Sequence, residues 1–162
     1  MNSTELLDTI SSFYRDKLTI RNRHVAAAEF VSDYNVNNTY QYVINRDDMH
    51  VRWLQDAISD LGGTPESQPL PDISPGKGAA AATSVITADR DAAAKFVERW
   101  RPRLESMPNA RHRTLLNVIL GESLEQQRFF EQALAGREDL LGRRDGGKST
   151  GGGVLSKRWV GQ

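Results

Sequence analysis

The sequence predicts an all-α protein built from four helices, arranged as two antiparallel hairpins joined by one long crossover. Apolar residues recur three or four positions apart over four long stretches. Short turns separate the first stretch from the second and the third from the fourth. Between the two pairs lie Pro65, Pro69, Pro71 and Pro75, in a stretch that cannot form a regular helix along most of its length.

The first predicted helix covers residues 3–34 and the second covers residues 39–61. Residues 35–39 combine poor helix formers with good N-caps, so we place a short turn there, with a bent continuous helix as the alternative. The sequence Gly-Gly-Thr-Pro at 62–65 supplies a left-handed cap and a stop for the second helix. The expected core residues of the first helix are Leu6, Ile10, Phe13, Ile20, Ala27 and Val31, and those of the second are Tyr40, Val43, Leu54, Ala57 and Leu61.

The third predicted helix covers residues 88–107 and follows a crossover at 62–87. Thr87 and Asp89 are its candidate N-caps. Pro102 lies near its end and is expected to kink it, because proline removes a backbone donor. The expected core residues are Ala93, Phe96, Val97, Trp100 and Leu104.

The fourth predicted helix covers residues 109–136, with Asn109 as its N-cap and Gly136 at its end. Its expected core residues are Leu115, Leu116, Ile119, Phe129, Phe130, Ala133 and Leu134. The four helices predict one domain over residues 1–140, which is long enough to bury a core without disulfides. Residues 141–162 are glycine-rich and predict a flexible tail.

Composition excludes several classes of site and partner. The chain has no cysteine, which excludes disulfides and thiolate metal sites and suits a reducing cytoplasm. Its 21 basic residues balance its 21 acidic residues, so we expect no nucleic-acid partner. The sequence does not open with the basic region and apolar run of a signal peptide. It also has no run of 18 apolar residues that could span a membrane. We therefore expect a cytoplasmic protein without a membrane partner.

Polar residues interrupt the apolar stripes at the middle of the expected bundle. Asp47 and His50 lie three residues apart on the inner face of the second helix, where a carboxylate and an imidazole can bind one metal ion. Glu122 lies at the matching depth of the fourth helix, with Glu125 on its flank. His24 lies on the inward stripe of the first helix. Burial would otherwise favour leucine at such positions, so these residues are the candidate metal ligands.

The segment 45–54, Asn-Arg-Asp-Asp-Met-His-Val-Arg-Trp-Leu, followed by Leu-Gly-Gly at 61–63, resembles the second helix of ferritin-like and rubrerythrin-like proteins. Members of that family carry Glu-x-x-His on this helix and often end it with Leu-Gly-Gly. Element order extends the resemblance over about residues 3–137. It implies a ferritin-like four-helix bundle that holds two iron or manganese ions for oxygen or peroxide chemistry.

The chain departs from the family pattern at several ligand positions. Asp47 stands where the family has glutamate, and the fourth helix has no histidine. Lys17 and His24 occupy the inward polar positions of the first helix, where the family has a glutamate. If Arg128 stood in a ligand position, its fixed charge would repel a metal ion.

Two functional hypotheses follow and stay open at this point. In the first, Asp47 and His50, with Glu122 and Glu125, hold iron or manganese in an oxidoreductase. In the second, the chain binds no metal, and Asp47 and His50 form an interior hydrogen-bonded pair in a structural or partner-binding bundle. An intermediate alternative is a single-ion site, in which Asp47, His50 and one or two of His24, Glu122 and Glu125 hold zinc or iron. A homodimer, and a protein partner for the C-terminal tail, are further expectations.

Overall fold

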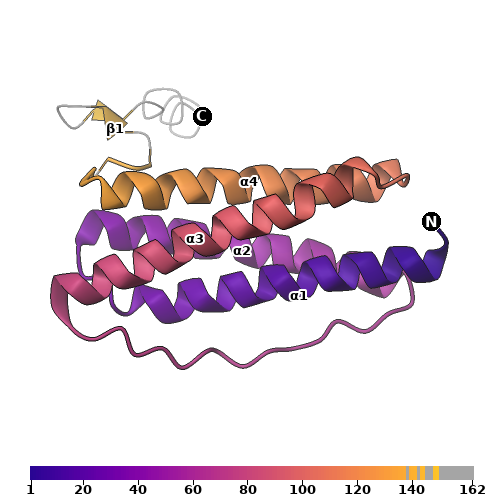
Figure 1. Cartoon of the computed structure of the whole chain (residues 1–162), viewed down its shortest axis with the longest axis horizontal. Coiled ribbons are helices and arrows are strands. Elements are labelled where there is room, and N and C mark those ends of the chain that lie inside the picture. The colour runs from indigo at the N-terminus through magenta and orange to yellow at the C-terminus, as the bar shows by residue number, and fades with distance from the viewer. Residues whose placement is uncertain (138, 142, 145–147, 150–162) are drawn as a thin grey trace, which may run out of the picture.

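The computed structural model describes residues 1–137, 139–141, 143–144 and 148–149. Four long helices lie side by side. The first and second run in opposite directions, as do the third and fourth, whereas the second and third run in the same direction (Figure 1). The all-α four-helix bundle predicted from the sequence is confirmed. The helices are α1 (Ser3–Ala28), α2 (Tyr34–Asp60), α3 (Gly78–Glu105) and α4 (Ala110–Leu134). Most contacts between helices join α1 to α2 and α3 to α4.

Beyond the bundle, β1 (Arg143–Arg144) and β2 (Lys148–Ser149) form a short antiparallel pair. The rest of the tail predicted at 141–162 lies largely outside the described residues. Along the described part of the chain, no helix combines the length and apolar character that crossing a membrane requires.

The first turn lies earlier than the sequence predicted. Helix α1 ends at Ala28, and α2 begins at Tyr34, so residues 35–39 are helical and form no turn. The Asp33 carboxylate caps α2 by accepting a hydrogen bond from the Val36 amide at 2.9 Å. The Asn37 side chain donates to the Ala28 carbonyl at 3.2 Å, so it fastens the turn instead of breaking the helix.

Helix α3 begins ten residues before the predicted start at 88, so the connection between the hairpins covers only residues 61–77. Gly78 has a left-handed φ of 69°, and the alanine run that follows it has the highest helix propensity. Thr87 and Asp89 therefore lie inside the helix and do not cap it. Pro102 lies inside α3 without ending it, since the helix continues to Glu105.

The start of α4 agrees with the sequence. Asn109 caps it by accepting a hydrogen bond from the His112 amide at 3.0 Å. The helix ends at Leu134, two residues before the predicted end, and Gly136 follows it with a left-handed φ of 86°.

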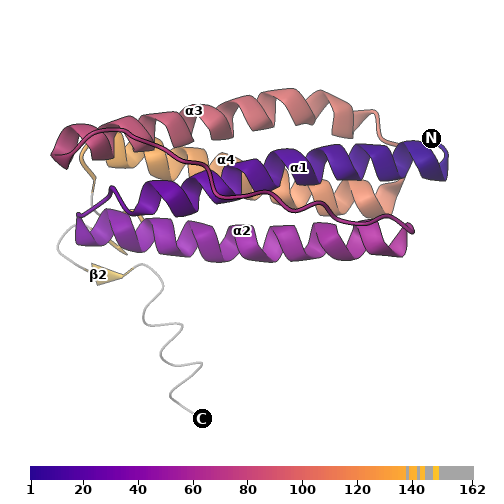
Figure 2. The same cartoon turned by 90° about the horizontal axis from the view of Figure 1, so that it is seen from below.

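The connection between α2 and α3 runs along the outside of α1 for much of the length of the bundle (Figure 2). Side chains of α1 hold it in place. The Tyr14 hydroxyl donates to the Glu66 carbonyl at 2.6 Å, and the Arg15 guanidinium binds both carboxylate oxygens of Glu66 at 3.2 Å. Thr19 adds a hydrogen bond to Gln68 at 3.0 Å.

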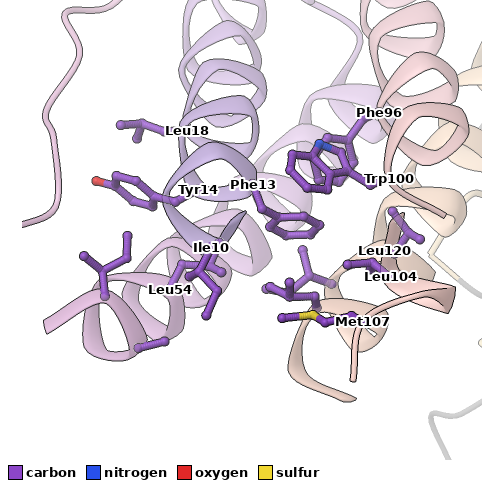
Figure 3. Packing of buried hydrophobic residues seen from close by; sticks show 14 of the residues in the cluster. Ile10, Phe13, Tyr14, Leu18, Leu54, Phe96, Trp100, Leu104, Met107 and Leu120 are labelled. Carbon is purple, nitrogen blue, oxygen red and sulfur yellow. The ribbon is translucent and has the colours of Figure 1, made fainter. Parts of the chain in front are cut away.

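The core consists of two apolar clusters. The larger one contains Phe13, Phe96 and Trp100 (Figure 3). The ring centroid of Phe13 lies 5.0 Å from that of Phe96 and 5.0 Å from that of Trp100. The smaller one gathers around Tyr40 and Phe130. Along α2 and α4, buried polar residues lie between the positions that contribute to the two clusters. These polar residues form the layer that contains the candidate site.

Candidate functional site

The polar layer of the bundle draws buried side chains from three helices. Helix periodicity turns each of them inward, because each is three or four residues from an apolar core position. The layer is sealed from solvent: the four charged or histidine side chains at its centre are 0% exposed. Its members are Lys17 and His24 of α1, Asp47 and His50 of α2, and Ser123 and Gln126 of α4.

Asp47 is the centre of a hydrogen-bonded network. Its Oδ1 accepts from the Lys17 ammonium at 2.6 Å and from the Gln126 amide at 3.0 Å. Its Oδ2 lies 2.6 Å from Nδ1 of His24, which donates to the carboxylate. The His24 ring packs against that of Phe130, with centroids 5.3 Å apart. Both oxygens of Asp47 are therefore occupied by donors from α1 and α4.

The charge on Asp47 is stabilised inside the bundle. Burial alone would raise the pKa of this carboxyl, but the Lys17 ammonium and His24 oppose that effect and hold its pKa well below the usual range. Asp47 is thus a carboxylate at neutral pH. A charge inside a protein needs an opposite charge and hydrogen bonds, and Lys17 and Asp47 supply both to each other.

His50 belongs to a second pair. Its Nδ1 is 4.0 Å from Oδ1 of Asp47, too far for a hydrogen bond, whereas its Nε2 bonds to Oε2 of Glu122. Burial, and then the Lys17 charge, lower the pKa of His50, so the ring is neutral and donates Nε2–H. Arg46 donates its Nε–H to the other oxygen of Glu122 at 2.7 Å. Burial would raise the pKa of Glu122, but His50 and Arg46 lower it overall.

A further buried contact joins α2 to α3. The Tyr40 hydroxyl donates to Oδ2 of Asp89 at 2.6 Å, and the Arg23 guanidinium lies 3.8 Å from Oδ1. Sequence reasoning assigned Asp89 to a helix cap and missed this role. A signal was present, because Asp89 lies four residues before Ala93 on the apolar stripe of α3.

Replacing Asp89 with asparagine tests the energetics of that contact. Burial raises the pKa of Asp89 despite the opposing effects of His24, Tyr40 and Arg23, so the folded chain binds this proton more tightly than the unfolded chain. The wild-type side chain therefore contributes stability below the ordinary carboxyl pKa of about 4, and this contribution is lost as pH rises through the raised pKa. Asparagine is neutral and can still accept from Tyr40.

We expect the stability of Asp89→Asn relative to wild type to be greatest near pH 8 and to decline towards pH 4. Urea denaturation curves of both proteins across that range measure the difference, and groups common to both cancel. A difference that is independent of pH would contradict the raised pKa of Asp89.

The predicted metal ligands do not come together in one place. Asp47 and His24 share a network, and His50 and Glu122 form the neighbouring pair, but Glu125 is exposed on the surface of α4. Within the part of the chain that the structure describes, no cluster of three or more histidine, cysteine, aspartate or glutamate side chains is placed to hold a metal ion. Arg128, whose charge would repel a metal ion from a ligand position, is also exposed.

The chemistry of the polar layer, as arranged, does not fit an iron or manganese ion. A cation bound to Asp47 would meet the Lys17 ammonium, which is already in hydrogen-bond contact with Oδ1. A cation bound to Glu122 would compete with the Arg46 guanidinium. Among the residues that the structure describes, none makes a hydrogen bond to Nε2 of His24 or to Nδ1 of His50. These two nitrogens belong to rings whose other nitrogens bond to different carboxylates, Asp47 for His24 and Glu122 for His50.

Comparison with protein-family models and with curated proteins finds no match to this sequence.

Proposed function

We propose that this chain is a metal-free four-helix bundle with a structural or partner-binding role. In this proposal a polar network takes the place that a metal site has in ferritin-like proteins. The buried contact of 2.6 Å between Lys17 and Asp47 carries the proposal. The ammonium supplies the positive charge that would otherwise come from a metal ion, so the carboxylate is neutralised without one.

The isolation of the network also supports a role other than catalysis. Lys17, His24, Asp47 and His50 are all fully buried, so a substrate could reach them only if the helices separated. A reacting site needs its groups within hydrogen-bond reach of the substrate. We therefore propose that the function lies on the outer faces of the bundle, where a partner can bind without disturbing the core.

Elemental analysis tests this proposal. We expect protein purified without a tag or a chelator to contain far less than one iron or manganese ion per chain, and aerobic loading with ferrous iron or with manganese to leave that value unchanged. We expect His50→Ala to lower thermal stability without changing metal content, because it leaves Glu122 with Arg46 alone.

Glu125→Gln is the matched control, since it removes a carboxylate from the same helix at an exposed position. About one or two metal ions per chain, lost in His50→Ala and kept in Glu125→Gln, would overturn the metal-free proposal. That result would favour the ferritin-like iron or manganese hypothesis, which stays a prediction. Oxygen and peroxide assays would then follow.

A further inference from the structure

A cavity of about 400 Å³ lies between α2 and α4, near the end of the bundle where α4 begins. Pockets of this size can hold a small organic molecule, and gaps between the helices of a bundle are common places for them. Direct contacts between α2 and α4 are sparse compared with those inside either hairpin. The lining residues are Trp53, Asp56, Ala57 and Asp60 of α2, and Arg111, His112, Leu115 and Val118 of α4.

The apolar part of the cavity is fixed by the core beneath it. Trp53 and Leu115 are half-buried and pack against the larger apolar cluster. The Trp53 ring lies 5.7 Å, centroid to centroid, from the ring of His50, which is itself fully buried. Val118 is 47% exposed at the rim. The cavity therefore offers an indole and two aliphatic side chains to a ligand.

The cavity lining also carries charged side chains from both helices. Asp56 and Asp60 lie one turn apart on α2, and Arg111 lies across from them on α4. Within the described residues, no hydrogen bond or ion pair joins any of these three side chains to another group. Charged side chains that converge on a cavity without partners are available to a bound ligand.

His112 adds no positive charge to the lining at neutral pH. Burial, followed by the nearby charge of Arg111, lowers the pKa of its ring despite the opposing effect of Asp60. The neutral ring can donate Nδ1–H to Oδ1 of Asn109, which is 2.8 Å away. The lining thus carries two carboxylates against one guanidinium, and this balance favours a cation over an anion.

We propose that this cavity binds a small organic amine with a flat aromatic body. The ammonium group would contact the carboxylates of Asp56 and Asp60, and the Trp53 ring would attract the same charge. The aromatic body would cover Leu115 and Val118. This proposal depends on the surface between α2 and α4 alone, so it stands or falls independently of the metal-free proposal.

Isothermal titration calorimetry of the full chain with two probes tests the charge preference. Tryptamine carries an ammonium on an indole, and indole-3-acetate carries a carboxylate on the same ring system. We expect tryptamine to bind with a Kd below about 1 mM, and indole-3-acetate to bind at least tenfold more weakly. No binding of tryptamine, or equal binding of the two probes, would overturn the proposal.

Two variants locate the site. Asp56→Asn/Asp60→Asn is expected to weaken tryptamine binding at least tenfold, whereas Asp8→Asn, at an exposed position on α1, leaves it unchanged. Val118→Arg places a long cation over the exposed rim and is expected to abolish binding while the circular dichroism spectrum stays that of the wild type. Tryptamine affinity that survives either change at the cavity would place its binding elsewhere and overturn the proposal.

Discussion

Asp47→Ala is expected to lower the free energy of unfolding by about 3–5 kcal/mol, because it leaves the Lys17 ammonium buried without its partner. Both side chains are fully buried, so water cannot replace the lost carboxylate without opening the bundle. His24 and Gln126 lose the same acceptor. A domain of this kind has a total stability of roughly 5–15 kcal/mol, so urea denaturation should begin in much milder conditions for the variant.

The double variant Lys17→Met/Asp47→Leu distinguishes two causes of the stability loss in Asp47→Ala, the unpaired charge of Lys17 and the lost side-chain volume. It removes both charges and keeps side chains of similar size, so we expect it to recover most of the stability lost in Asp47→Ala. His24 and Gln126 remain without their acceptor, which limits the recovery. A double variant as unstable as Asp47→Ala would show that the unpaired ammonium is not the cause of the loss.

Trp100→Ala is expected to lower the free energy of unfolding by about 3–5 kcal/mol, by creating a large cavity in the apolar core. Trp100 is 1% exposed and is among the largest buried side chains. Its ring packs edge-on against Phe13 at the centre of the larger cluster (Figure 3). Its indole nitrogen donates to the Asp16 carboxylate at 2.8 Å, and the Arg103 guanidinium lies 5.0 Å from the ring.

Trp100→Phe is the matched control. It keeps an aromatic ring against Phe13 but removes the hydrogen bond to Asp16, which has a second partner in Arg99 at 3.0 Å. We expect thermal or urea denaturation to report a much smaller loss for phenylalanine than for alanine. Equal losses in the two variants would mean that the hydrogen bond, and not the volume of the ring, holds this part of the core together.

The four helices and their inner faces could be predicted because apolar spacing reports directly which side of a helix is buried. Every residue predicted on the core face of α3, from Ala93 to Leu104, is buried. The first turn was misplaced because low helix propensity at residues 35–39 is outweighed by contacts across the turn. The Asp33 cap and the Asn37 side chain supply those contacts.

The position of the polar layer could be predicted from the sequence, but the hydrogen-bond partners of its residues could not. Spacing put Asp47 and His50 on one face of α2, and both are buried there. Which residue of α1 faces Asp47 depends on where the turn falls, since moving it by a few residues shifts α1 along α2. The structure selects Lys17 and His24 together, and His50 turns to Glu122. Two residues that share a helix face need not share a ligand, because their side chains point to different neighbours.

The pairing of helices that are adjacent in sequence has a consequence for how the chain folds. Because most helix contacts lie within α1–α2 and within α3–α4, each hairpin can form from local contacts before the other is present. The Lys17–Asp47–His24 contacts belong wholly to the first hairpin, whereas Gln126 comes from the second. We therefore expect the ion pair to form within the first hairpin while water still surrounds it, and packing of the second hairpin to exclude that water. In that order, neither charge would be buried alone during folding.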